Sequence, residues 1–303
     1  MRYSFVCILL LNYFAASPQQ ITCRVTDANT DTALAYATVI FKSGNQFFYT
    51  DSSGEFSFSK NEIQNNDSIM IQYVSYATVT LPVSQLADGI NIKLHPQINL
   101  LENVTVTACS NLKAITINKI RGKAKDYLGP GPETRMIIIT RFTNDENLTG
   151  FIKEIEFYSG SFIEKAQVPV RIHWYKWDTL QTIPGEEITN TNIIVYPNHK
   201  GWNKFSIPAR TIFYPDEGVV LGLEFIYPVE YKKQYASFVD DKEKIDWLND
   251  MNHRWSLGMQ TTSNGENGTF FIMNNEAVAA YSKKSDYRYL KPAMRIAIEI
   301  CKQ

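Results

Sequence analysis

Four side chains suited to ligand recognition share one face of a short segment, "VRIHWYKWD", at positions 170–178. Side chains alternate along a β-strand, so one face of this segment carries Arg171, His173, Tyr175 and Trp177. Two aromatic rings, a guanidinium and an imidazole offer flat apolar area and directed hydrogen-bond donors, which a sugar or peptide ligand requires. We therefore predict a ligand-binding surface at these four residues.

The opposite face of the same segment carries Ile172 and Trp174, which suit a hydrophobic core. We expect His173, Tyr175 and Trp177 to be more exposed than these two residues, since a slip of one residue in strand register would exchange the faces. An alternative stays open. In that alternative, a loop or the partner domain covers the polar face, and its charged residues only cap it.

No metal-binding or catalytic motif accompanies this segment. A zinc peptidase would carry a histidine with glutamate three residues later, or the H-E-x-x-H pattern. The four histidines begin "HPQI", "HWYK", "HKGW" and "HRWS", and none has that glutamate. The G-x-S-x-G, G-x-x-x-x-G-K and G-x-G-x-x-G patterns are also missing from the sequence. We therefore predict no metal, no cofactor and no catalytic residues, so that the chain is not an enzyme.

A hydrolase whose carboxylates meet only in the folded chain is a further alternative, as in glycoside hydrolysis. Glu154, Glu156 and Glu224 lie in segments with strand alternation. Their competing interpretation is the solvated face of amphipathic strands. Trp202, in "KGWNKF", presents a similar choice, and we interpret it as a packing anchor rather than a stacking platform. The loop "TNDENLTG", 143–150, offers oxygen ligands for calcium, but its composition is typical of a solvated turn.

The composition indicates a globular chain whose net charge would not attract a polyanion. Of 303 residues, 44% are apolar and 20% are charged, which suits two domains with cores of their own. Lysine and arginine number 30 and aspartate and glutamate 31, so the formal net charge is −1. Nucleic acid is therefore not an expected partner.

The first residues have the order of a secretory signal peptide. Arg2 precedes an apolar run over 5–11, and small residues follow at 15–17. We predict a signal peptide over residues 1–17 and export to the periplasm, the outer membrane or the cell surface, with no transmembrane segment in the mature chain. Cys7 would leave with the signal. The odd, sparse set that remains argues against a disulfide scaffold: Cys23, Cys109 and Cys301.

Residues 20–94 alternate as short strands separated by turn residues. In "YTDSSGEFSF", 49–58, Asp51 and Gly54 fit the first and fourth positions of a type I turn, and we expect this turn to close a hairpin. Phe56 and Phe58 should share the buried face beyond it. Cys23 alternates with apolar neighbours, so we expect a buried small hydrophobe. About seven strands in this length predict a small antiparallel sandwich.

The order of these pieces resembles the carboxypeptidase regulatory-like family. The resemblance rests on a strand that ends in "VTD", then "ALAYATVIF", "TDSSGEFSF" and "DSIMIQYVSYA". It implies an accessory transthyretin-like or Ig-like sandwich and no catalytic domain. Members commonly have glycine where Cys23 stands and a Gly-Tyr pair where Ser75 and Tyr76 stand. The segment "LLENVTVTA", 100–108, resembles the strand that follows such domains in exported proteins of Bacteroidetes.

Strand patterns resume at Arg135 in eight segments, the last of which is "MRIAIEI". They predict a second, larger sandwich, most simply a jelly roll, and similar jelly-roll domains accompany regulatory-like domains in Bacteroidetes. "DDKEKIDWLND", 240–250, predicts a short helix. We divide the chain into a signal peptide (1–17), a regulatory-like sandwich (18–96), a linker strand and connection (97–133), and a jelly-roll-like sandwich (134–303).

These features together predict an all-β, non-catalytic exported protein of the bacterial envelope. It would act as a binding or assembly module, with the small sandwich as an adaptor and an envelope protein or glycan as partner. The alternatives are a glycan-binding module that uses the aromatic strand face and the carboxylate-dependent hydrolase described above.

Overall fold

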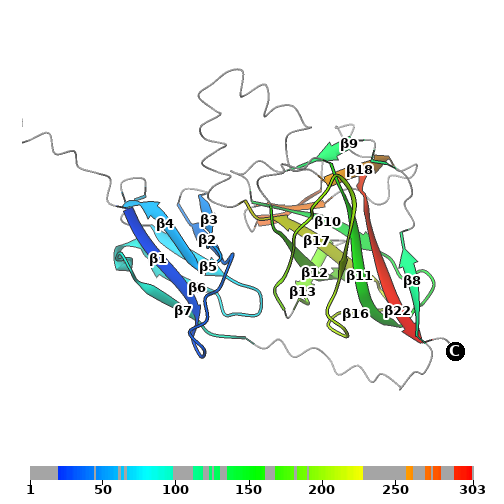
Figure 1. The fold of residues 1–303 in the computed structure, drawn as a ribbon, viewed down its shortest axis with the longest axis horizontal. Coiled ribbons are helices and arrows are strands. Elements are labelled where there is room, and N and C mark those ends of the chain that lie inside the picture. The colour runs from blue at the N-terminus through cyan, green and yellow to red at the C-terminus, as the bar shows by residue number, and fades with distance from the viewer. Residues whose placement is uncertain are drawn as a thin grey trace, which may run out of the picture. The chain divides into compact units, whose positions relative to one another are not determined.

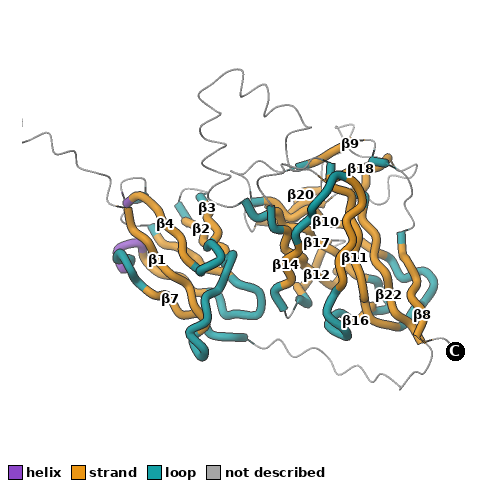
Figure 2. Tube along the Cα trace, viewed as in Figure 1, coloured by secondary structure: helices purple, strands orange, loops and turns teal. Residues whose placement is uncertain are grey.

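The computed structural model describes residues 20–43, 46–60, 63–64, 67–97, 112–118, 123–124, 126–129, 135–160, 168–180, 183–189, 191–227, 257–261, 270–273, 276–280 and 290–301. They fall into two compact units. The first spans residues up to Gln72 together with Ala77–His95, and the second spans Tyr73–Tyr76 together with the chain from Pro96 onward. Both units are built from β-strands (Figure 1), and the 3-10 turn Val83–Gln85 is drawn in purple in Figure 2.

The first unit has seven strands in two sheets, as the sequence predicts. One sheet has the order β4-β1-β7, with bounds Glu55–Ser59, Gln20–Asp27 and Asn91–Leu94. The other has the order β3-β2-β5-β6, with bounds Phe47–Tyr49, Thr38–Phe41, Ser68–Gln72 and Val79–Pro82. Phe41 of β2 packs edge-on against Phe58 of β4 at 5.3 Å between ring centroids, which joins the two sheets. The unit is therefore a β-sandwich, but the prediction of a wholly antiparallel one is wrong, because β7 pairs parallel with β1.

The Asp51–Gly54 turn forms as predicted, but the hairpin is wrong. The Gly54 amide donates to the Asp51 carbonyl, and the Asp51 carboxylate accepts from the backbone amides of Ser53 and Glu55. However, β3 pairs with β2 whereas β4 pairs with β1. The turn thus carries the chain from one sheet to the other. Gly54 has a φ of +76°, and a Cβ there would lie 2.7 Å from the carbonyl oxygen of Val25, so the position requires glycine.

The prediction that Cys23 is buried is met, and Ser75 has an unusual backbone conformation. Cys23 is fully buried and unpaired, and burial, aided by Asp88, raises its thiol pKa to about 11. Ser75, which stands where family members commonly have glycine, has a φ of +65°. That left-handed conformation is the one that glycine adopts without steric cost.

The second unit has two larger sheets. The β12 sheet has the order β13-β12-β17-β10-β19-β20, with β14 also paired to β12. Its strands are β13 (Ile183–Glu187), β12 (Val170–Asp178), β17 (Val219–Phe225), β10 (Met136–Phe142), β19 (Phe270–Met273), β20 (Glu276–Ala280) and β14 (Ile193–Val195). The β11 sheet has the order β21-β18-β11-β22-β8, with β15 and β16 paired to β11 and β9 paired to β18. Its strands are β21 (Leu290–Pro292), β18 (Leu257–Thr261), β11 (Gly150–Ser159), β22 (Met294–Cys301), β8 (Leu112–Ile117), β15 (Gly201–Ser206), β16 (Phe213–Tyr214) and β9 (Asp126–Leu128).

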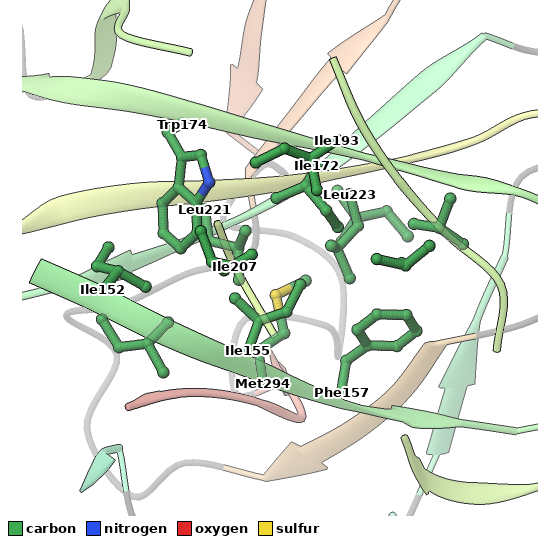
Figure 3. Packing of buried hydrophobic residues seen from close by; sticks show 14 of the residues in the cluster. Ile152, Ile155, Phe157, Ile172, Trp174, Ile193, Ile207, Leu221, Leu223 and Met294 are labelled. Carbon is green, nitrogen blue, oxygen red and sulfur yellow. The ribbon is translucent and has the colours of Figure 1, made fainter. Parts of the chain in front are cut away.

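A single hydrophobic core lies between these two sheets (Figure 3). The β12 sheet contributes Ile172, Trp174 and Leu221, and the β11 sheet contributes Ile155 and Met294. All five are fully buried. The second unit is therefore a sandwich as well, and the all-β fold class predicted from the sequence is confirmed.

All eight strand segments predicted after Arg135 contain a strand, whereas the connection contains two that were not expected, β8 and the short β9. Leu112–Ile117 forms β8, which pairs antiparallel with β22 at the edge of the β11 sheet. Its residues alternate only between exposed and half-buried, so the hydrophobic period that reveals inner strands is weak there. The predicted signal peptide (1–17), the 100–108 segment and the predicted helix (240–250) lie outside the described residues. Within the described part of the chain, no helix is long and apolar enough to cross a membrane.

Candidate functional site

The four predicted site residues do share one face of β12, but three of them are buried. Arg171 is 2% exposed, His173 4% and Tyr175 6%, while Trp177 is half-buried. Ile172 and Trp174, on the opposite face, are fully buried. The predicted order of exposure is therefore correct, but the exposed fractions of His173 and Tyr175 exceed those of Ile172 and Trp174 by only a few per cent. This face is the outer face of the β12 sheet, and it is not an open platform.

Glu224 of β17 organises the polar residues of this face. It lies directly opposite Arg171 in the β12–β17 register, and its side chain is fully buried. Arg171 donates from Nη1 to Oε2 at 2.7 Å, and Arg135, one residue before β10, donates from Nε to Oε1 at 2.6 Å. Two arginines thus engage one carboxylate that has no access to water.

His173 joins Glu224 to a second carboxylate. Its Nε2 lies 3.1 Å from Oε2 of Glu224, and its Nδ1 lies 2.7 Å from Oε1 of Glu187 on β13. A carboxylate only accepts, so both ring nitrogens must carry a proton to make these bonds. His173 is therefore an imidazolium, and its ring stacks on Tyr175 at 6.0 Å between centroids with an interplanar angle of 12°.

The pKa values of Glu224, His173 and Glu187 are shifted in the direction that keeps each of these side chains charged. Burial alone would raise the pKa of Glu224, but the two arginines outweigh burial and hold the pKa well below 4.5. Burial alone would lower the pKa of His173, yet Glu187 and then Glu224 raise it above 6.5. The pKa of Glu187 is lowered because His173 outweighs burial. Burial, Glu187 and Glu224 raise the pKa of Tyr175 well above 10, so its hydroxyl keeps its proton.

Arg135, Arg171, His173 and Glu224 are buried and Glu187 is half-buried, and we call these five residues the buried ion cluster. Three positive groups face two carboxylates, and each carboxylate contacts at least one cation. A carboxylate held ionised by two arginines is poorly suited to act as a general acid. Among the residues that the structure describes, no three metal-binding side chains converge. The arrangement is typical of a network that fixes the register of β10, β12 and β17.

Trp177 lies at the end of this face and makes a cation–π contact with a further arginine, Arg141. The guanidinium of Arg141, on β10, sits over the Trp177 ring with Cζ 4.3 Å from the centroid. Trp177 also packs on the small apolar cluster of the same face, which includes Ile139 and Val220. Of the four residues predicted to bind a ligand, Trp177 is the one that retains substantial exposure.

Trp202 is packed against neighbouring side chains, as predicted from the sequence. Arg295 of β22 lies over its ring at 3.6 Å, and Tyr158 of β11 meets it edge-on at 5.7 Å. Arg295 also donates to Glu156 at 2.8 Å. These residues lie on the outer face of the β11 sheet, where Glu154 likewise pairs with a cation, Lys204, at 2.6 Å.

The sequence pattern correctly placed Arg171 and His173 on one face of β12 but did not reveal their charged partners. Arg135 and Glu187 were not singled out, and Glu224 was interpreted as a residue of a solvated face, which is wrong for a side chain with no exposure. A signal was present in "VVLGLEF", because a lone acid in an otherwise apolar strand, buried on both faces, needs a cationic partner.

The family match concerns mainly the first unit, whereas the similar solved structures cover most of the chain. Residues 21–106 match the model of the CarboxypepD_reg-like domain family, a regulatory-type Ig-like domain. No curated protein matches the chain. Two structures of Cwp84 from Clostridium difficile are similar at 7% identity. One is the clostridial cysteine protease after propeptide cleavage (TM-score 0.37; 88% of this chain, 65% of that one). The other is the cysteine protease and lectin-like domains of this surface layer associated protein (TM-score 0.35; 88% and 59%).

The chain thus spans less than two thirds of the length of either solved structure. The family match, in contrast, includes the seven strands of the first unit and extends past its last strand, β7. Residues 21–106 are therefore similar to a CarboxypepD_reg-like domain, which is the conclusion that sequence, fold and comparison share.

Proposed function

We propose that this chain is a non-catalytic exported protein of the bacterial envelope that acts as a binding or assembly module. The first unit serves as an adaptor, and the second unit, as a jelly-roll-like sandwich, supplies the contact surface. The observation that carries this proposal is the match of residues 21–106 to a regulatory-type domain, which is a non-catalytic class of module.

The buried ion cluster supports a structural rather than a catalytic role for the outer face of the β12 sheet. Its histidine already donates from both ring nitrogens, and Glu224 already accepts from two arginines. A general base needs a lone pair within reach of a substrate proton. Because these groups saturate one another, the face stabilises the sheet and leaves recognition to its surroundings.

Export and envelope location rest on the sequence. The charged, apolar and small-residue order of 1–17 supports a cleaved signal peptide, and the 100–108 segment resembles exported proteins of Bacteroidetes. N-terminal sequencing of the mature chain recovered from fractionated cells tests both points. We expect a start near residue 18 in the envelope or periplasmic fraction, and a cytoplasmic chain that begins at Met1 would contradict export.

A glycan is the partner class that one contact favours. Trp177 remains half-buried beside Arg141, an aromatic and a donor at the accessible end of β12. A screen of glycans and peptidoglycan fragments against the chain without residues 1–17, run beside Trp177→Ala, tests this. Binding that is lost in the variant supports recognition near Trp177. If no glycan or fragment binds the unaltered chain, the partner is instead an envelope protein.

A further inference from the structure

A cleft of about 400 Å³ lies in the second unit beside the end of β8 and the loop that joins β10 to β11. The described residues that line it are 116–118, 141–146 and Leu148, and Arg141, Asp145 and Glu146 are its charged members. Its volume falls in the range of small-molecule sites in proteins. None of its residues belongs to the buried ion cluster, so the cleft is separate from the network of Glu224.

The loop that forms one wall of the cleft is fixed by internal hydrogen bonds. The Asn144 side-chain amide donates to the carbonyls of Leu148 at 2.8 Å and Pro215 at 3.1 Å, and its oxygen accepts from the Leu148 amide at 2.7 Å. The Tyr214 hydroxyl donates to the Thr143 carbonyl at 2.7 Å. The wall is therefore preorganised, which reduces the entropy that a ligand would otherwise lose on binding.

Arg141 reaches the cleft with hydrogen-bonding capacity to spare. Its guanidinium is held over the Trp177 ring at 4.3 Å, and its Nε is buried without an acceptor among the described residues. A buried donor without an acceptor is costly, whereas a ligand oxygen would satisfy it. Burial also lowers the pKa of Arg141, which Asp145 partly offsets, and the guanidinium stays charged.

The charges around the cleft select the chemical class of the ligand. Asp145 and Glu146 are exposed on the loop, so an anionic ligand would be repelled there, and a cationic ligand would be repelled by Arg141. A neutral polyhydroxyl ligand meets all three groups at once, because a hydroxyl accepts from arginine and donates to a carboxylate. We propose that this cleft binds a neutral carbohydrate, through Arg141 as donor and Asp145 and Glu146 as acceptors.

This inference deepens the binding function proposed above and rests on it. The test uses the whole chain without residues 1–17 and an array of neutral oligomers of glucose, mannose, galactose and N-acetylglucosamine. Oligomers of uronic acids and of glucosamine provide anionic and cationic comparisons. The neutral oligomer that binds most tightly is then titrated by calorimetry into Arg141→Gln, Glu146→Gln and a control, Glu186→Gln, whose carboxylate is exposed on β13.

We expect a neutral oligomer to bind more tightly than either charged set. Arg141→Gln should weaken binding about tenfold or more, Glu146→Gln should weaken it severalfold, and Glu186→Gln should leave it unchanged. Because Glu146 is exposed, Glu146→Gln tests the cleft even if Arg141→Gln unfolds the protein.

Preference for uronic acid or glucosamine oligomers, or no binding of any neutral oligomer, would overturn the proposal. Neutral binding that survives both cleft variants would place the glycan elsewhere, so that the cleft assignment fails while the binding function stands. Cleavage of the bound oligomer would instead overturn the non-catalytic function itself.

Discussion

At the scale of single residues, Glu224 is the group on which the outer face of the β12 sheet depends. A carboxylate with no exposure is stable as an ion only because Arg135, one residue before β10, and Arg171 of β12 donate to it. The arginines depend on it in turn, since removal of its charge leaves two buried guanidinium groups with less compensation. Glu224 therefore contributes to the stability of the fold through these ion pairs and not through a chemical reaction.

Glu224→Gln should lower the free energy of unfolding by about 3–5 kcal/mol, because it breaks a buried charge network. Glu154→Gln is the matched control. Glu154 pairs with Lys204, whose side chain is 60% exposed, so its loss should cost ~1 kcal/mol or less. Urea unfolding of the two variants makes the comparison. Equal, small losses would show that the cluster contributes nothing beyond a surface pair.

The same cluster predicts how stability changes with pH. The pKa of His173 is raised in the folded chain, so its contribution is fully present below the unfolded value near 6.5 and disappears as pH rises through the raised folded value. The free energy of unfolding should therefore fall across that window. His173→Gln should flatten the profile, whereas His199→Gln, on an exposed loop, should not. A profile that keeps its slope in His173→Gln would assign the titration to another group.

At the scale of elements, the turn between β3 and β4 shows why local signals and pairing differ. Asp51 and Gly54 specify a turn, and the sequence reveals it correctly because turn chemistry is local. Which strands then pair is decided by sheet packing over long sequence separations, since β4 pairs with β1 across separations of 31 (Arg24 to Glu55) to 39 residues (Gln20 to Ser59). The hairpin prediction failed for that reason.

Gly54→Ala should destabilise the first unit more than Gly89→Ala does. Both glycines have a positive φ, +76° and +77°, so the backbone strain of alanine is nearly the same at the two sites. Only at Gly54 would the new Cβ meet a neighbour, the carbonyl oxygen of Val25 at 2.7 Å, whereas nothing lies within 4 Å at Gly89. The difference between the two unfolding free energies should be about 1–3 kcal/mol. Equal values would show that the Val25 contact relaxes without cost.

The strands of the second unit show which structural features sequence patterns predict and which they do not. β12 and β17 were recognised, and the two faces of β12 were assigned correctly because alternation defines them. Alternation does not say whether a polar face meets water or another polar face. Glu224 on β17 and Glu187 on β13 both contact His173 and form an ion network on that face. These contacts depend on the tertiary structure, which strand alternation does not determine. The edge strand β8 was missed because neither of its faces is deeply buried.

At the scale of the whole molecule, the described residues form two β-sandwich units. Residues 21–106 match a regulatory-type domain, and the second unit combines an ion cluster that stabilises one sheet with a preorganised cleft at the end of β10. The separation of the cluster from the cleft implies that stability and recognition respond to different substitutions. Variants of the cluster should shift unfolding, while variants of Glu146 should change affinity at unchanged stability.

The central claim, binding without catalysis, is tested most directly by recovery of the ligand. The chain without residues 1–17 is dialysed to equilibrium against a mixture of neutral oligosaccharides and soluble peptidoglycan fragments, and both compartments are analysed by mass spectrometry. The account predicts that at least one component is retained with the protein at unchanged mass and that no new masses appear. Product masses that depend on the protein would contradict it, whereas retention of no component would leave an envelope protein as the partner.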